Sequence, residues 1–128
     1  MTLRIVRLGT PRIPDEGTRI GTVRRLPRGV RKERFAADDW FDVWYPDLAP
    51  SPELLTRARA AKTDKEWNAF LRSFRAEMNA PAPRRTLDLL AALSHHANFS
   101  VGCYCEDESR CHRSVLRELF TERGASIR

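Results

Sequence analysis

The fold is decided by the stretch Asn98-Phe99-Ser100-Val101-Gly102-Cys103-Tyr104-Cys105-Glu106-Asp107-Glu108-Ser109-Arg110-Cys111-His112-Arg113. Its first five residues are typical of a buried strand, and residues 114–123 beyond it predict an amphipathic helix. A strand, a short polar loop and a helix start form the usual ligand-binding edge of an α/β sheet. All three cysteines and one of the three histidines fall in this stretch. The sequence therefore predicts where the protein acts, without naming the substrate.

The N-terminal part of the chain predicts two further strands. Residues 3–8 alternate apolar and basic side chains, and residues 19–24 form a second, weaker strand pattern. Residues 26–30 are a loop marked by proline and glycine. Residues 31–50 are rich in aromatic side chains, and we expect a short helix and a loop there that pack over the core.

The middle of the chain is helical. Ser51 is a suitable N-cap for a short helix to about residue 61, and Thr63 with Glu66 forms a capping-box pattern for the next. That second helix carries an apolar stripe at helical spacing, which we assign to the core: Trp67, Phe70, Leu71, Phe74 and Met78. The prolines at 81 and 83 break it, residues 87–93 form a buried helix, and residues 125–127 are a candidate last strand.

This order of elements predicts the fold class. Helical crossovers between strands favour parallel pairing, so we expect one compact α/β domain over residues 1–128, with a mostly parallel sheet and helices packed on it. A chain of 128 residues buries enough surface to fold without a disulfide or metal. No apolar run approaches a membrane span, the start lacks a signal-peptide pattern, and three cysteines is an odd number. We therefore expect a cytoplasmic protein with no membrane partner.

The positive charge is concentrated at one end. Residues 1–34 hold ten basic and three acidic side chains, a net charge of +7, whereas the remaining 94 residues have a net charge of −1. Within this region, residues 24–34 place six basic groups around the turn Pro27-Arg28-Gly29. Arginine binds phosphate and carboxylate bidentately, so the loop predicts an anionic ligand such as a phosphate, a nucleotide or nucleic acid. If the loop leaves the second strand at its carboxyl end, it lies on the same rim as the cysteines.

Four interpretations of the cysteine cluster remain open. Cys103, Cys105, Cys111 and His112 supply the four Cys/His ligands that zinc prefers, although neighbouring helical residues diverge by about 100°. Alternatively, Cys105 is a nucleophile with His112 as its base, beside Arg113 and a helix start. Finally, the cysteines simply pack in the core, or Cys103 and Cys105 act as a strained redox pair.

The whole chain resembles a bacterial family catalogued as domain of unknown function 488, with a YeaO-like branch. The matching residues are Gly17-Thr18-Arg19, Arg24, Pro27-Arg28-Gly29, Lys32, Trp40, Pro50-Ser51, Glu53-Leu54, Trp67, Phe70, Cys103-Tyr104-Cys105 and Cys111-His112-Arg113. The resemblance implies a compact α/β domain in the bacterial cytoplasm and an association with nucleotide or nucleic-acid processing. The YeaO-like branch has an aromatic residue where this chain has Leu26, and it lacks the cysteines but keeps a histidine matching His112. The resemblance thus makes an obligatory metal site less expected.

Together these observations predict an enzyme with an anion pocket that acts on a phosphate-bearing nucleotide or nucleic-acid substrate. Its expected catalytic residues are Cys105, His112 and Arg113. Its expected substrate-binding residues are Arg19, Arg24, Arg28, Gly29 and Lys32. The alternatives are a non-enzymatic nucleic-acid-binding module and a structural module stabilised by zinc or thiols. The sequence leaves the cofactor, with zinc as the candidate, and the oligomeric state unassigned.

Overall fold

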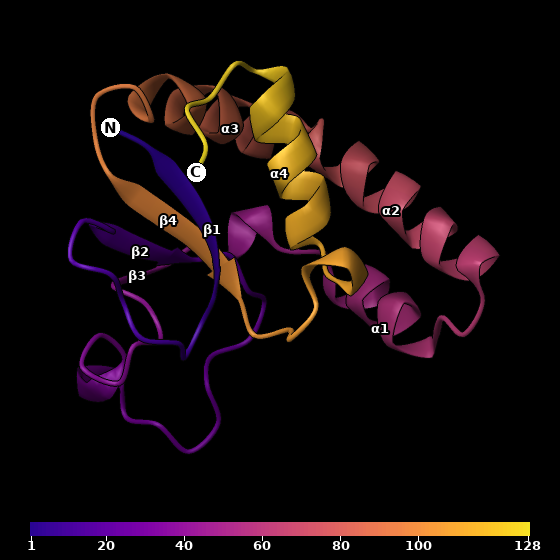
Figure 1. Cartoon of the computed structure of the whole chain (residues 1–128). Helices are drawn as coiled ribbons and strands as arrows, with labels where there is room; N and C mark the ends of the chain where they lie inside the picture. Colours follow the sequence, from indigo (N-terminus) through magenta and orange to yellow (C-terminus); the bar gives the residue numbers. More distant parts are fainter.

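The computed structural model describes residues 1–128 and contains a four-stranded sheet (Figure 1). The strands are β1 (Leu3–Arg7), β2 (Thr18–Gly21), β3 (Val43–Trp44) and β4 (Phe99–Cys103), in the order β1-β4-β2-β3. Every neighbouring pair is parallel. The α/β fold class is therefore confirmed. All of these strands place their carboxyl ends at one edge of the sheet.

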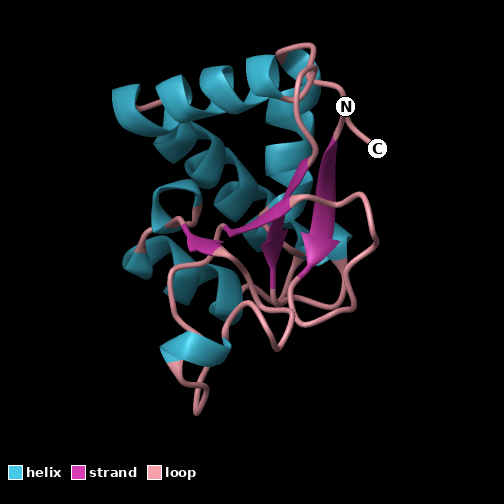
Figure 2. Cartoon of the chain, turned by 90° about the vertical axis from the view of Figure 1, so that its left-hand side faces the viewer, coloured by secondary structure: helices cyan, strands magenta, loops and turns pink.

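Four helices cover one face of this sheet, as Figures 1 and 2 show. They are α1 (Pro52–Ala60), α2 (Asp64–Met78), α3 (Pro81–Leu93) and α4 (Arg113–Glu122). Single-turn 3₁₀ helices occur at Lys32–Arg34, Pro46–Leu48 and Glu108–Arg110. The main core lies between helices and sheet, and the α2 stripe enters it through Trp67, Phe70, Phe74 and Met78. The assignment of this stripe to the core is confirmed.

The helix boundaries follow the capping residues in the sequence. Ser51 accepts a hydrogen bond from the backbone N–H of Leu54, and Thr63 accepts one from Glu66. Pro81 ends the α2–α3 connection and is itself the first residue of α3. Proline suits that position because the first helical N–H has no partner in the helix.

The second face of the sheet is covered by loops. Ser100 and Gly102 alternate with the core residues of β4, so they face away from the helices. Loop residues approach this face closely, since a Cβ added at Gly21 would lie 2.4 Å from the ring of Phe41. A smaller apolar cluster continues from this loop layer to the carboxyl edge of the sheet, where it includes Cys103 and Cys111.

Three expectations about local structure need correction. The second strand ends at Gly21 rather than residue 24, although the N–H of Thr22 still donates to Gly102. Residues 31–50 contain two 3₁₀ turns and the short strand β3 instead of one helix and a loop. The expected last strand is a single parallel bridge between Ile127 and Leu3. Short segments of this kind depend on the partner that tertiary packing supplies.

Candidate functional site

Two adjoining hollows lie at the carboxyl edge of the sheet. The thiol pocket, about 380 Å³, is lined on one side by Cys103, Cys105, Cys111 and His112. The arginine hollow, about 580 Å³, is lined by Arg7, Arg25, Arg28 and Arg59 with Trp40 and Tyr104. The loops after β1, β2 and β4 all contribute, because parallel strands end at the same edge. The expectation that the arginine and cysteine loops share a rim is confirmed.

The wall of the thiol pocket opposite the cysteines is largely apolar. It is built from α1 and α2 and from the segment before α1, through Pro50, Leu55, Trp67 and Phe70. Arg110 closes one side, with its guanidinium carbon 4.6 Å from the centre of the Trp67 ring. A cation over an aromatic face is attracted to the ring, so this contact holds Arg110 at the pocket.

The three cysteines differ in their access to the pocket. Cys103 and Cys111 are buried, whereas Cys105 is exposed. The Sγ atoms of Cys103 and Cys105 are 3.8 Å apart, and the chain bends at Tyr104 between them, just after β4 ends. The ligand atoms of Cys103, Cys111 and His112 all lie within 4.8 Å of one another. These three residues therefore form a buried cluster that could hold a metal ion.

The imidazole of His112 is held by the backbone. Its Nε2 atom lies 2.7 Å from the carbonyl oxygen of Thr22, and its Nδ1 atom lies 3.7 Å from Cys111 Sγ. A carbonyl oxygen only accepts, so Nε2 must carry a proton and donate. In the neutral ring, Nδ1 then presents its lone pair to the cysteine cluster. His112 is only 6% exposed, so this lone pair faces protein rather than solvent.

The objection that adjacent helical residues diverge does not apply to Cys111 and His112. Helix α4 begins at Arg113, and His112 is its N-cap. Cys111 is extended, with φ −139° and ψ 152°, because it ends the preceding 3₁₀ turn. This change of backbone direction turns the two neighbouring side chains toward the same point. The sequence argument failed because it placed both residues inside the helix.

The pKa values of the three thiols are shifted in different directions. The pKa of Cys105 is lowered to about 3, first by hydrogen bonds with the Cys103 and Cys111 thiols and further by the charge of Arg113. Conversely, hydrogen bonds with the other two cysteines, together with burial, raise the pKa of Cys103. The pKa of Cys111 is lowered as well, first by its hydrogen bond with Cys103. Burial also raises the pKa of the neighbouring Tyr104 to about 12.

Arg113 lies beneath the cysteine loop. Its side chain is 3% exposed, its Nη2 atom donates to the carbonyl oxygen of Cys105 at 2.6 Å, and its Nε atom has no hydrogen-bond partner. It forms no ion pair with any carboxylate of the protein. This geometry places a buried cation without a carboxylate partner next to the cysteines.

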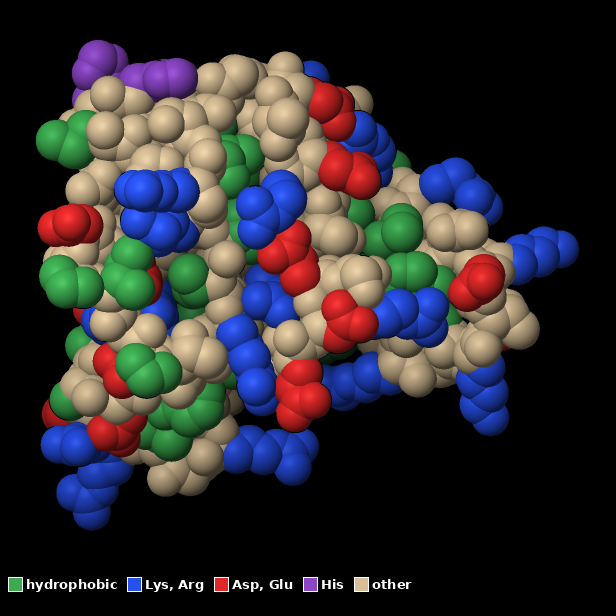
Figure 3. All heavy atoms as spheres, viewed as in Figure 1, with side chains coloured by type: hydrophobic (Ala, Val, Ile, Leu, Met, Phe, Trp, Pro, Cys, Tyr) green, Lys and Arg blue, Asp and Glu red, His purple; other side chains and the backbone are tan.

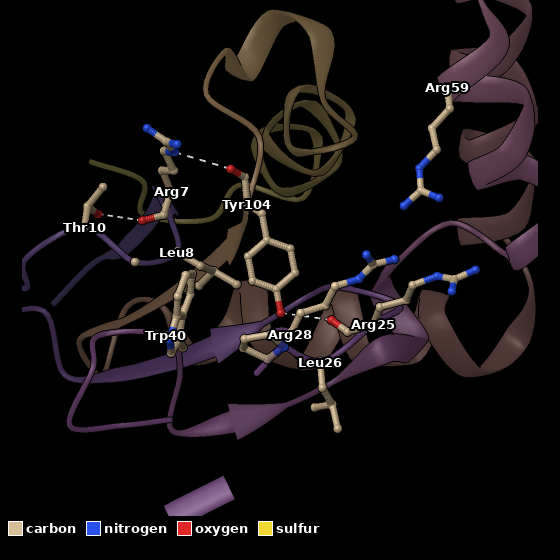
Figure 4. A pocket seen from close by; sticks show the side chains of 11 residues that line it. Arg7, Leu8, Thr10, Arg25, Leu26, Arg28, Trp40, Arg59 and Tyr104 are labelled. Atoms are coloured by element: carbon tan, nitrogen blue, oxygen red, sulfur yellow. Dashed lines mark hydrogen bonds between the residues drawn. The ribbon is translucent and has the colours of Figure 1, made fainter. Parts of the chain in front are cut away.

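The guanidinium groups of Arg25, Arg28 and Arg59 lie near one another on one side of the arginine hollow (Figure 4). None of these three side chains forms an ion pair within the protein. On the opposite side, Arg7 donates to the backbone oxygen of Tyr104 and is 3.6 Å from a Glu106 carboxylate. Three neighbouring cations without a counter-charge favour an anionic ligand.

The predicted substrate-binding residues are dispersed. Arg28 lines the arginine hollow, and Arg24 lines the thiol pocket while donating to the carbonyl oxygens of Pro50 and Ala49. Lys32 and Gly29 line neither hollow, although Gly29 does adopt the positive φ, 71°, that favours glycine. Arg19 is completely buried in the loop-covered layer.

The buried position of Arg19 has a structural explanation. Its guanidinium donates twice to Glu16, at 2.6 and 2.9 Å, and also to the backbone oxygens of Thr10 and Asp39. Ser100 donates to the same Glu16 carboxylate at 2.8 Å. Arg19 therefore connects the sheet to the loops and is not part of either hollow.

Sequence reasoning singled out neither Arg25 nor Arg59 as a binding residue. The loop places Arg25, the neighbour of the predicted Arg24, in the wall of the arginine hollow, while Arg24 donates to a backbone carbonyl oxygen. Arg59 lies on α1, far along the chain, and nothing in its local sequence separates it from Arg57. Only the packing of α1 beside the loop after β2 brings it to the hollow. On the face seen in Figure 3, some Lys and Arg side chains lie beside acidic ones, whereas others extend from the surface without an acidic neighbour.

Comparison with known proteins identifies the family. The family described as "Active DUF488-N3 subclade" matches residues 3–124, so the chain belongs to the DUF488 family. No curated protein and no solved structure matched the chain. No helix is long and apolar enough to cross a membrane.

Proposed function

We propose that this DUF488-family domain is an enzyme that binds a phosphate-bearing nucleotide or nucleic-acid end in the arginine hollow and acts on it at the cysteine cluster. One observation carries the proposal: the two hollows share Arg25, Arg59 and Tyr104 in their walls. When the phosphate of a ligand contacts these arginines, the chemical group attached to that phosphate can therefore extend into the thiol pocket.

The proposed phosphate site consists of Arg25, Arg28 and Arg59. Their guanidinium groups have no carboxylate partner, and the fork of each matches two phosphate oxygens. Tyr104 and Trp40 stand beside them with ring centroids 5.7 Å apart. Their ring faces and edges provide an apolar contact for a sugar or base attached to the phosphate.

In the thiol pocket, Cys105 is the group that meets the substrate, since it is the exposed member of the cluster. His112 and Arg113 act from below as positioning residues. His112 orients Cys111 from its hydrogen bond to Thr22, and Arg113 holds the backbone of Cys105. Both are nearly fully buried, so direct contact with a substrate is left to Cys105.

The proposal is tested by binding of a single-stranded oligonucleotide with a 5′-phosphate, against the same oligonucleotide with a 5′-hydroxyl. We expect the phosphorylated form to bind more tightly and Arg59→Ala to weaken it about 10- to 100-fold, the loss of one or two charge-assisted hydrogen bonds. Arg57→Ala is the matched control, because Arg57 is equally exposed on the same helix but lies outside both hollows. Equal effects of the two substitutions would refute the phosphate site.

Catalysis is tested separately with Cys105→Ser. An enzyme of the proposed kind loses turnover of the phosphorylated oligonucleotide or of a nucleoside diphosphate, while its affinity for them changes little. Unchanged turnover in this variant would place the chemistry elsewhere.

The second candidate is a non-enzymatic module that binds nucleic acid through the basic N-terminal region. The net charge of +7 in residues 1–34 favours it. However, Arg7, Arg12, Arg19 and Arg34 within that region are engaged by acidic side chains, which leaves fewer free cations than the sequence suggests. A binding module should show steep salt dependence from many phosphate contacts and no response to Cys105→Ser.

A further inference from the structure

We infer that Cys103, Cys111 and His112 hold a zinc ion, and that Cys105 completes its coordination from the side of the thiol pocket. The inference concerns the cluster alone and does not depend on the proposed phosphate-bearing substrate. It starts from three preorganised ligand atoms, all within 4.8 Å of one another and all on buried residues.

The distances fit a tetrahedral zinc site. With Zn–S near 2.3 Å and Zn–N near 2.0 Å, two sulfur ligands lie about 3.8 Å apart, and a sulfur and a nitrogen about 3.5 Å apart. The Cys103 and Cys105 sulfurs are 3.8 Å apart, and the separation between Cys111 Sγ and His112 Nδ1 is 3.7 Å. Two opposite edges of the tetrahedron are thus already formed. The ligand atoms that lie within 4.8 Å of one another are those of Cys103, Cys111 and His112, so metal binding would draw the Cys105 sulfur inward from the Cys103 edge.

The tautomer of His112 also fits. Metal-binding histidines usually donate their second ring N–H to a carbonyl or carboxylate, which fixes the ring and raises its basicity. His112 makes this contact through Nε2 to the Thr22 carbonyl, at 2.7 Å. The remaining nitrogen, Nδ1, is the one that faces the sulfurs.

The charge of the surroundings is a further, independent observation. A buried guanidinium without an anionic partner is costly, and Arg113 is 97% buried with a free Nε and no carboxylate partner. A zinc ion bound by three thiolates and a neutral imidazole carries one net negative charge. Such a centre places a fixed negative charge beside Arg113, whose guanidinium already donates to the carbonyl oxygen of Cys105.

The position of Cys105 distinguishes this centre from a closed structural site. Cys103, Cys111 and His112 are buried, whereas Cys105 is exposed on the pocket wall. Catalytic zinc sites keep three protein ligands and one position that a substrate or water can take. Cys105 occupies the side of the centre that faces the pocket, so its withdrawal would open the metal to a ligand there.

The test is metal content and Co²⁺ substitution on the full chain purified without chelator. We expect about one zinc per chain, and a Co²⁺ form with thiolate-to-metal charge-transfer bands and the intense visible bands of tetrahedral cobalt. Cys111→Ser and His112→Asn should lose the metal. Cys105→Ser should retain it with lower affinity and a weaker charge-transfer band. His95→Asn is the matched control, since His95 is an exposed histidine outside the cluster.

The wild-type chain gives an answer even if the buried variants fail to fold. A Co²⁺ spectrum without thiolate bands, or a folded protein with three freely titratable thiols after zinc addition, would overturn the inference. Equal metal content in His95→Asn and a folded His112→Asn would overturn it as well. None of these outcomes bears on phosphate binding by Arg59, so the two proposals fail separately.

Discussion

The substitution Glu16→Gln tests how the loop-covered face of the sheet is held. Glu16 is 3% exposed and Arg19 is fully buried, and their side chains form two hydrogen bonds. The change removes the negative charge while nearly preserving the shape of the side chain. It leaves the Arg19 guanidinium buried with only neutral acceptors, the carbonyl oxygens of Thr10 and Asp39 among them.

We expect Glu16→Gln to lower the free energy of unfolding substantially, although the substitution changes little of the side chain's shape. Removing one partner of a buried ion pair costs about 3–5 kcal/mol, because the remaining charge stays desolvated. For a domain of this size, about 1 kcal/mol lowers Tm by roughly 3–5 °C, so we expect Tm to fall by roughly 10–20 °C. The loss is a substantial part of the 5–15 kcal/mol that typically stabilises a domain.

Urea denaturation followed by circular dichroism measures this difference directly. The control is Asp38→Asn, which breaks the Arg34–Asp38 pair on the surface, where side-chain exposures are 61% and 37%. Exposed ion pairs contribute only about 0.2–1 kcal/mol. A loss in Glu16→Gln no larger than in Asp38→Asn would refute the argument that a buried, compensated charge joins the loops to the sheet.

Three further outcomes are expected. Burial raises the pKa of Glu16, but hydrogen bonds from Arg19 and Ser100 outweigh it and hold the pKa below its usual 4.5. The ionised Glu16 therefore contributes its full stabilisation of the fold above about pH 5, and this contribution is lost as the pH falls through the pKa of Glu16 in the folded protein. Thermal melts from pH 6 to 3 should show this decline in the wild type and a flatter profile in Glu16→Gln, and parallel profiles would contradict it. Gly21→Ala should cost about 1–3 kcal/mol in denaturant titrations, because the new Cβ would lie 2.4 Å from the ring of Phe41, and a neutral effect would show that the loop yields easily. Ultraviolet absorbance should show Tyr104 losing its proton near pH 12, as the difference between the titration curves of the wild type and Tyr104→Phe, while circular dichroism confirms the fold. A midpoint near the ordinary value of about 10 would show that the phenol is not desolvated.

The positions of the strongest elements could be predicted from local sequence alone. The period of the apolar residues in α2, and the capping pattern of Thr63 with Glu66, need no tertiary information, and both are confirmed. The parallel pairing of β4 could be inferred in the same way, because the long helical connection before β4 favours it. The strand β3 could not, since its two residues become a strand only by pairing with β2.

The sequence predicted where the candidate site lies, but tertiary packing decided which side chains line it. The cysteine stretch identified the edge of the sheet, because the order of a strand, loop and helix places that loop there. Which arginines face the hollow was decided by the turn after β2 and by the docking of α1, and these brought in Arg25 and Arg59. The same packing buried Arg19 against Glu16, an outcome that its local sequence does not distinguish from a surface arginine.

By itself, then, the sequence determined the periodic elements, their parallel arrangement and the edge at which thiols and arginines meet, because these depend on neighbours along the chain. The tertiary structure decided which charges are paired and which remain free. It also turned Cys111 and His112 toward one point through the extended backbone at Cys111. Both depend on contacts between segments distant in sequence, such as the hydrogen bond between His112 and Thr22, and no local pattern encodes those contacts.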